Sequence, residues 1–444
     1  MQTLSTAPIA RDAVQQQLIE LMQEFVITYD LEWNQPVQAE TTCVHDLGLS
    51  SVDFIQLVLS IESAFEQKLG FQDLLVQKGE YVEDVSVQDL GDFIHHKLSN
   101  PTQTESAQAV ASVSSLPDEQ RLQPAQISTF KTMIAQRLAE VNSGVIGAEV
   151  ATAKNPPAIF VLAPPRSGST LLRIILAGSP QLLSPPELHL LSYATLAQRK
   201  ASLAGEATQQ LLQGTIRAIA QLQNCSVEQA ERMMALYEQD NLTTKAFYKI
   251  LQDWAGEQML SDKTPTYGFS LDTLAKAERD FSNPIYIHLV RHPYGMIRSY
   301  QESKLERIVP IANANHFSTR ELAELTWLTS HENILEFLQD IPSNRQHRIR
   351  YEDLVQDPYA SVRQLCRALN IEFCPDMLDP YGDMKQRMTD GGRKVSDMSG
   401  DLKFYLHSNI DSSAADRWRQ FHAVDFLGRS ASKLANAFGY DVAV

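Results

Sequence analysis

A turn rich in small and hydroxyl-bearing residues follows a short apolar run, Val161 to Ala163. The turn and the start of the helix predicted after it consist of Arg166, Ser167, Gly168, Ser169, Thr170 and Leu171. Successive backbone N–H groups at the N-terminus of a helix form a site for an anion, and neighbouring hydroxyls add donors. The GxxxxGK[ST] pattern is absent, so a nucleoside triphosphate with magnesium is the poorer fit. We predict a phosphate-like ligand here; the alternative is an ordinary helix-capping turn.

A second candidate anion site lies at the end of a later apolar run, Ile285 to Val290. Arg291 follows this run, and Ser299 comes eight residues later, in the next predicted helix. One guanidinium offers paired donors to a phosphate, and a hydroxyl in the first turns of a helix completes such a cage. The alternative for Arg291 is an ion pair at the surface.

Together these segments resemble the sulfotransferases that use 3'-phosphoadenosine 5'-phosphosulfate (PAPS). In that family the 5'-phosphosulfate loop reads R-S-G-[ST]-T-x-[LM], which residues 166–172 match without a gap. The family's 3'-phosphate signature is an Arg at a strand end and a Ser eight residues on, which Arg291 and Ser299 match. The resemblance covers about residues 156–425 and is closest to the sulfotransferase modules of curacin-type and olefin-synthase polyketide enzymes. It implies PAPS as the sulfuryl donor and requires no metal.

The resemblance also implies which groups act on the acceptor. In tyrosylprotein-type members a catalytic Glu follows the loop Arg by 21 positions, which falls on Glu187. Lys263 matches the Lys of the family's D/N-K-x-P turn, which helps to hold the transferring group, and Arg166 neutralises charge beside it. His189, two residues from Glu187, is a helper or an alternative base. The structural alternatives are a capping carboxylate for Glu187 and an ordinary histidine.

Further segments extend the resemblance with lower specificity. Residues 395–404 (VSDMSGDLKF) resemble the loop that closes over the nucleotide, which implies Ser396 and Lys403 as nucleotide contacts. Residues 350–354 (RYEDL) and Trp327 match less specific features of the family.

The first hundred residues carry most of the negative charge. Of the net charge of −16, they account for −12, with sixteen Asp or Glu against four Lys or Arg. Such acidity argues against nucleic acid or an anionic membrane as a partner and favours proteins with basic docking faces.

Within this acidic region, residues 46–53 (DLGLSSVD) resemble the attachment motif of acyl carrier proteins, D-x-G-x-D-S-[LV]. The resemblance implies that Ser51 carries a covalent 4'-phosphopantetheine added by a phosphopantetheinyl transferase, although Ser50 stands where Asp is usual. It also implies upstream polyketide or acyl-loading enzymes as partners and, optionally, a downstream thioesterase. The alternative is a plain N-cap before an amphipathic helix.

The elements that must position these groups follow from apolar periodicity. Helical spacing predicts helices over residues 13–29, after Ser51 and over residues 87–98. Residues 99–126 are rich in Ser, Gln, Thr and Pro, which predicts a flexible linker. A helix near residues 127–141 comes next. Buried-type strands then alternate with helices, as is typical of a parallel α/β sheet. These strands are predicted at residues 158–163, 285–290 and 348–351.

We therefore expect a small acidic all-α four-helix carrier domain (1–98), a flexible linker (99–126) and a P-loop-like parallel-sheet sulfotransferase domain (127–444). The leading hypothesis is transfer of a sulfuryl group from PAPS to a hydroxyl, taken as the β-hydroxyl, of an acyl chain on the carrier in polyketide or fatty-acid-derived biosynthesis. A first alternative is a free small alcohol, phenol or amine as acceptor, with the carrier domain serving docking only. A second is an inactive nucleotide-binding adaptor that presents a carrier arm.

Composition and cysteine spacing indicate where the protein is located and whether it binds a metal. The longest apolar stretch, residues 158–163, is far shorter than the roughly 20 residues of a membrane span. The N-terminus lacks the pattern of a signal peptide, so we expect a cytoplasmic protein without membrane partners. The four cysteines match neither a disulfide framework nor a zinc spacing, and no metal site is predicted.

Overall fold

The computed structural model divides the chain into two compact units, Met1–Ala111 and Ser112–Val444. We call them the N-terminal unit and the C-terminal unit and describe each by itself. The structure describes residues 11–28, 33, 35–49, 57–58, 60–61, 64–65, 69, 71, 74, 76–77, 80–81, 84–99, 114–142, 153–205, 208–303, 317–382, 410–421 and 424–442. The predicted positions Ser51, Ser396 and Lys403 lie outside these residues.

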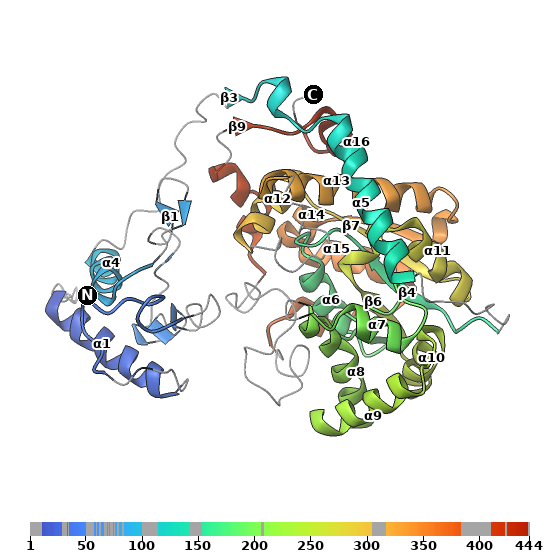
Figure 1. Cartoon of the computed structure of the whole chain (residues 1–444), viewed down its shortest axis with the longest axis horizontal. Helices are drawn as coiled ribbons and strands as arrows, with labels where there is room; N and C mark the ends of the chain where they lie inside the picture. The colour runs from blue at the N-terminus through green and yellow to red at the C-terminus, as the bar shows by residue number, and fades with distance from the viewer. Residues whose placement is uncertain are drawn as a thin grey trace, which may run out of the picture. The chain divides into compact units, whose positions relative to one another are not determined.

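The described part of the N-terminal unit is mainly helical (Figure 1). α1 (Arg11–Thr28) and α4 (Val87–Ser99) occupy two segments for which helical spacing predicts a helix, and β1 (Val76–Gln77) pairs antiparallel with β2 (Glu80–Tyr81). The two helices bury their apolar stripes in one core, to which they contribute Val14, Leu18, Met22, Leu90 and Ile94. Each large apolar side chain buried in this way contributes about 1.5–3 kcal/mol. The helix predicted after Ser51 begins outside the described residues.

A five-stranded parallel sheet forms the centre of the C-terminal unit. Its strands are β4 (Ala158–Leu162), β5 (Leu182–Leu183), β6 (Met259–Lys263), β7 (Ile285–Val290) and β8 (Gln346–Arg350). They lie in the order β5-β6-β4-β7-β8. Every residue of β4 is buried, as expected for a central strand covered on both faces. The predicted parallel α/β class is confirmed, with strands at the β4, β7 and β8 positions; the sequence did not predict β5 and β6.

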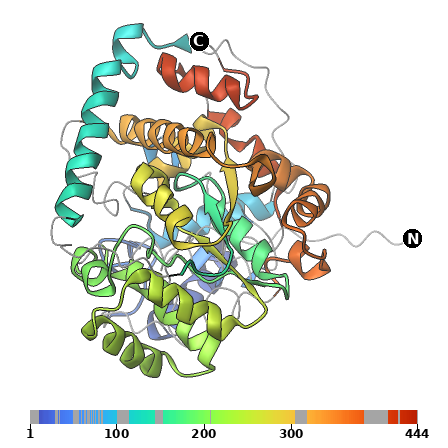
Figure 2. The same cartoon turned by 90° about the vertical axis from the view of Figure 1, so that its right-hand side faces the viewer.

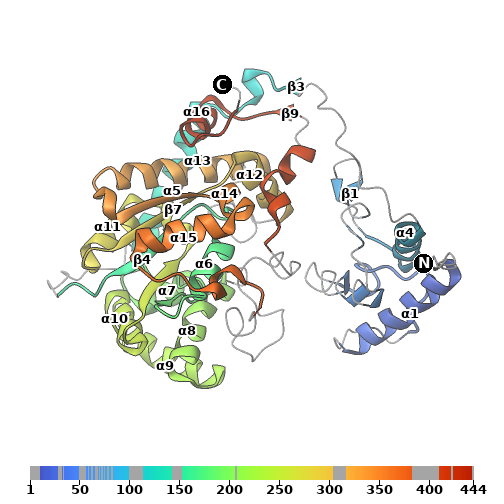
Figure 3. The ribbon, with the colours of Figure 1, turned by 180° about the vertical axis from the view of Figure 1, so that it is seen from behind.

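Helices cover both faces of this sheet. Phe160 of β4 packs among residues of α10, α11 and α13. Its neighbour Val161 points to the opposite face and packs among residues of α6 and α15. Figure 3 shows α6 and α15 over the face turned to the viewer. The described helices are α5 (Pro124–Asn142), α6 (Ser169–Ala177), α7 (Leu196–Ser202), α8 (Gln213–Gln223), α9 (Val227–Gln239), α10 (Thr244–Ala255), α11 (Leu271–Asp280), α12 (Pro293–Glu302), α13 (Thr319–Leu338), α14 (Tyr351–Gln356), α15 (Pro358–Leu369) and α16 (Arg429–Ala437).

The last part of the segment predicted as a linker belongs to the C-terminal unit, which begins at Ser112. β3 (Ser114–Ser115) pairs in parallel with β9 (Val424–Asp425). Arg121 then joins the two segments, donating from Nε to the Leu116 carbonyl at 3.0 Å and from Nη1 to the Leu427 carbonyl at 2.7 Å. A polar composition predicts solvated chain on average. It does not show that one arginine will bond both to a carbonyl of its own segment and to a carbonyl of a distant segment.

The helix that follows this segment is the long α5, which matches its predicted position. Figure 2 shows it running along one side of the C-terminal unit. Within the described residues, no helix combines the length and the apolarity that a membrane span requires.

Candidate functional site

The turn between β4 and α6 places two residues in the left-handed region of φ. Arg166 has a φ of 65° and Gly168 a φ of 85°. A Cβ atom on Gly168 would lie 2.2 Å from Cδ2 of Tyr351, so this position requires glycine for both conformational and steric reasons. Gly168 is the N-cap of α6 and has no side chain to accept from the first N–H groups of the helix. Those groups therefore remain donors for an anion.

The other residues of the predicted anion loop differ in what they can offer. Ser167 is fully buried, and its Oγ atom has no hydrogen-bond partner among the described residues. Ser169 is buried and Thr170 partly buried in the first turn of α6. The side chain of Leu171 packs in the core between the sheet and the helices α6 and α15, so this residue can offer a ligand only its backbone groups.

The strand order brings three predicted residues to one edge of the sheet. β4 lies between β6 and β7. Arg166 follows β4, Lys263 ends β6 and Arg291 follows β7, so all three lie at the carboxyl ends of adjacent parallel strands. The order of the strands along the chain reverses at β4, and open α/β sheets bind ligands at such switch points.

The two predicted anion elements are in direct contact. Arg166 donates from Nε to Ser299 Oγ at 3.0 Å, and Arg291 donates from Nη1 to the Arg166 carbonyl at 2.7 Å. The Arg291 guanidinium also lies 4.4 Å from the ring centroid of Tyr351, and Trp327 donates from Nε1 to the Arg291 carbonyl at 3.0 Å. Backbone and side chain of Arg291 are thus fixed beside the turn.

Tyr351 and Trp327 are supporting residues that sequence reasoning did not assign to the site. Both appeared only within low-specificity matches. The one available signal for Tyr351 was its position at the end of the last predicted strand, which lies in the structure next to the strand that Arg291 follows. That Tyr351 also fills the space beside Gly168 depends on tertiary packing.

A second group of predicted residues forms a charged cluster in which Lys263 and His189 are buried and Glu187 is partly buried. Lys263 Nζ forms an ion pair with Glu187 Oε1, and His189 Nε2 lies 3.2 Å from Glu187 Oε2. Burial opposes ionisation of Glu187, but the charges of Lys263 and His189 and their hydrogen bonds hold its pKa well below the usual range. Burial lowers the pKa of Lys263, and Glu187 counteracts this effect. Glu187 is therefore a carboxylate between two hydrogen-bond donors.

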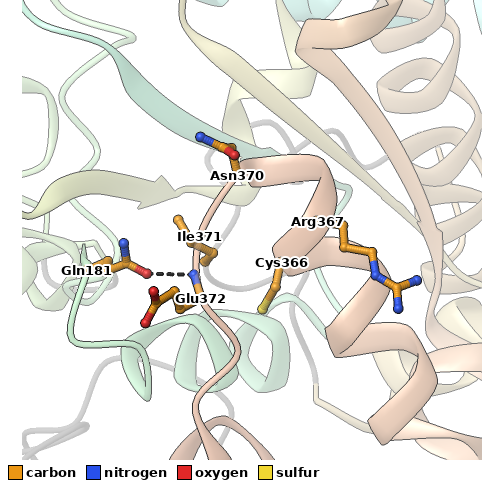
Figure 4. Close-up of a pocket in the computed structure, with 6 residues that line it drawn as sticks. All are labelled: Gln181, Cys366, Arg367, Asn370, Ile371 and Glu372. Atoms are coloured by element: carbon orange, nitrogen blue, oxygen red, sulfur yellow. Dashed lines mark hydrogen bonds between the residues drawn. The ribbon is translucent and has the colours of Figure 1, made fainter.

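A cavity elsewhere in the C-terminal unit contains none of the predicted site residues. It has a volume of about 510 Å³ and is lined by Gln181, Cys366, Arg367, Asn370, Ile371 and Glu372 (Figure 4). Gln181 directly precedes β5, so the cavity lies toward the amino ends of the parallel strands. The site formed by the predicted residues lies at the opposite edge of the sheet, where the strands have their carboxyl ends.

Comparison with known proteins identifies the class. The model of the Sulfotransferase family matches residues 157–375. The sulfotransferase domain from the curacin biosynthetic pathway is 35% identical, with a TM-score of 0.60; the match covers 66% of this chain and all of that domain. The sulfotransferase domain from the Synechococcus PCC 7002 olefin synthase is also 35% identical, with a TM-score of 0.59, covering 67% and 100% of the two chains. No curated protein gives a significant match. The chain belongs to the sulfotransferase family and is an enzyme of that type.

Replacing Arg291 tests the predicted 3'-phosphate contact. We expect Arg291→Ala to weaken binding of adenosine 3',5'-bisphosphate about thirtyfold, because a charge-assisted hydrogen bond of roughly 2 kcal/mol is lost. Calorimetry measures the change. Arg298→Ala is the control, since Arg298 lies on α12, the helix that follows Arg291, but pairs with Glu302 at 2.7 Å. Equal affinity of the Arg291 variant and the native protein would contradict the assignment.

Proposed function

We propose that this protein transfers a sulfuryl group from PAPS to a hydroxyl, specifically the β-hydroxyl, of an acyl chain carried on phosphopantetheine at Ser51. One observation carries the proposal. The two predicted anion-binding elements, the turn at Arg166 and the pair Arg291 and Ser299, lie at the same edge of the sheet as the cluster of Lys263, Glu187 and His189. The two anion-binding elements would bind the donor, and the cluster would act on the acceptor.

The residues around the turn fit the donor nucleotide. The buried Ser167 Oγ has no partner among the described residues, and an unpaired buried hydroxyl is costly unless a ligand completes it. Arg166, Ser167 and the N–H groups of the first turn of α6 would hold the 5'-phosphosulfate. Arg291 and Ser299 would hold the 3'-phosphate. PAPS would supply an activated sulfuryl group, because transfer of this group releases adenosine 3',5'-bisphosphate, a stable phosphate leaving group.

The cluster gives each residue a role in the transfer. Glu187 accepts the proton of the attacking hydroxyl while the new oxygen–sulfur bond forms and the bond from sulfur to the phosphate oxygen breaks. Lys263 stabilises the negative charge on the transferring oxygens, and Arg166 stabilises the charge that develops on the phosphate. His189 holds Glu187 in place or serves as an alternative base. In-line positioning and charge neutralisation supply most of the catalysis.

The acceptor part of the proposal is supported by the N-terminal unit. Its sequence resembles acyl carrier proteins around Ser51, and its described part is a helical unit with its own core. The two most informative relatives are named for a curacin biosynthetic pathway and an olefin synthase. We therefore propose a place in polyketide or fatty-acid-derived biosynthesis, with a phosphopantetheinyl transferase and an acyl-loading enzyme as partners. A downstream thioesterase would be a further partner.

Intact-mass measurement tests the proposal. The full-length protein, carrying phosphopantetheine loaded with a β-hydroxyacyl group, should gain the mass of one sulfuryl group when PAPS is added and none without PAPS. Ser51→Ala should abolish phosphopantetheine attachment and with it the gain, because the Ser51 hydroxyl is the attachment nucleophile. Ser50→Ala is the matched control and should keep both.

Two outcomes would contradict the proposal. Transfer to a free alcohol, phenol or amine but not to the loaded protein would leave the carrier with a docking role. Binding of nucleotide without transfer to any acceptor would make the chain an adaptor.

A further inference from the structure

The backbone turn that carries Glu187 and His189 is strained. His189 has a φ of 48°, in the left-handed region, which is unfavourable for a residue with a Cβ atom. Such a conformation persists only where the surrounding structure holds it. The groups that hold this turn are buried side chains to which the proposed reaction assigns no role.

Tyr267 binds the N–H groups of the turn. Its hydroxyl accepts hydrogen bonds from the N–H groups of Leu190 at 3.1 Å and Leu191 at 3.2 Å, and donates its proton to Asp262 Oδ2 at 2.8 Å. Tyr267 and Asp262 are both fully buried. The one proton and both lone pairs of the hydroxyl are therefore used.

Thr264 extends the same arrangement by one residue. Its Oγ atom accepts from the N–H group of His189 at 3.3 Å and donates to Asp262 Oδ1 at 2.9 Å. Since a carboxylate can only accept, each Asp262 oxygen accepts a hydrogen bond from one of these hydroxyls, whose oxygen is then free to accept from the turn. Burial raises the pKa of Asp262, and its hydroxyl donors counteract that effect. Three successive N–H groups, those of residues 189–191, are held in this way.

Arg199 holds the carbonyl side of the turn. It is fully buried, and its Nε atom donates to the carbonyls of Leu188 at 3.0 Å and His189 at 3.1 Å. The turn is thus fixed through both its donors and its acceptors, next to the end of the strand that carries Lys263.

We propose that Tyr267 is a positioning residue, whose hydroxyl holds Leu190 and Leu191 so that the turn keeps Glu187 in contact with both Lys263 and His189. Only the expected effect on turnover rests on the proposed function. The effect on the turn itself does not.

The chain offers a matched control in Tyr248. Its hydroxyl also donates to Asp262 Oδ2, at 2.5 Å, and lies 3.2 Å from the Tyr267 hydroxyl. Tyr248 is fully buried like Tyr267, but it is not bonded to the backbone of the turn in the structure. Tyr248→Phe and Tyr267→Phe therefore remove the same group from the same carboxylate, and only the second removes the acceptor for two backbone N–H groups.

Hydrogen exchange followed by mass spectrometry tests the positioning directly. In the full-length protein, Tyr267→Phe should speed exchange of the peptide containing residues 187–191 about tenfold or more, the effect of losing roughly 1.4 kcal/mol of protection. Tyr248→Phe should leave that peptide close to the native rate. Equal exchange in the two variants would overturn the proposal, whatever reaction the enzyme catalyses.

Turnover tests the consequence for catalysis. Tyr267→Phe should lower kcat about tenfold or more, while KM for the acceptor and affinity for adenosine 3',5'-bisphosphate stay within about twofold, since misplacement affects chemistry more than binding. Tyr248→Phe should lower kcat less. The two variants are compared at temperatures equally far below their unfolding midpoints, so that a difference in stability does not affect the comparison. Faster exchange with unchanged kcat would overturn the catalytic role. A native protein that sulfates only a free alcohol would refute the proposed acceptor, and the same kcat comparison would then be made with that alcohol.

Discussion

Glu187→Gln should lower the single-turnover rate about a hundredfold or more, the range expected when a general base is lost. The affinity for adenosine 3',5'-bisphosphate should stay within about twofold of the native value, because Glu187 contacts Lys263 and His189 rather than the anion turn. Glutamine keeps the shape of the side chain and can still accept from Lys263, but it cannot take up a proton. Rapid-quench kinetics and calorimetry on the same preparation measure the two quantities.

Glu278→Gln is a suitable control for this substitution. Glu278 also forms an ion pair, with Arg345 at 2.7 Å, on a helix that covers the sheet. The Glu278→Gln variant tests whether replacing any partly buried carboxylate slows turnover. Normal turnover by Glu187→Gln would leave Glu187 with a structural role, and His189, whose Nε2 atom lies 3.2 Å from Glu187 Oε2, would become the candidate base.

Gly168→Ala should weaken binding of adenosine 3',5'-bisphosphate about a hundredfold. The alanine Cβ would meet the Tyr351 ring at 2.2 Å, and the residue would have to adopt a φ of 85°, which costs about 1–2 kcal/mol in the left-handed region. Because the Arg291 guanidinium stacks on that same ring, moving the ring also displaces the predicted 3'-phosphate contact. One methyl group therefore disturbs both anion elements.

Gly256→Ala separates strain from steric conflict. Gly256 has a φ of 63°, but an added Cβ atom would meet nothing within 4 Å, and the residue follows α10 away from the turn. This variant should lose stability with little change in nucleotide affinity, as calorimetry and thermal unfolding would show. A Gly168 variant that binds nucleotide as tightly as the native protein would mean that the turn does not contact the ligand.

Local sequence patterns were sufficient to predict the elements that bear the anion turn. β4 is a short, entirely apolar run, and α6 starts directly after a glycine turn, so both appear in a single window of sequence. β6 was missed because its last residues, Asp262 and Lys263, are polar yet buried. A pattern of hydrophobicity cannot predict such a strand, since its burial depends on partners supplied by distant residues.

The charged cluster shows the same limit. Family spacing placed Glu187 and Lys263 in the site, but their ion pair joins residues 76 positions apart in the sequence. The role of Tyr267 has no local signal at all, because a buried tyrosine next to a strand is ordinarily a core residue. Its contacts with the turn exist because β6, which precedes Tyr267, lies beside β5, which precedes the turn.

The pairing of β3 with β9 fixes the point at which the chain enters the C-terminal unit. α4 ends at Ser99 and β3 begins at Ser114, so the stretch between them spans at most roughly 50 Å however it is arranged. Such a radius corresponds to a local concentration on the order of millimolar. In the proposed function, sulfation of the protein's own carrier would proceed at a rate that dilution does not change. A carrier on another protein would have to approach millimolar levels to compete with the attached one.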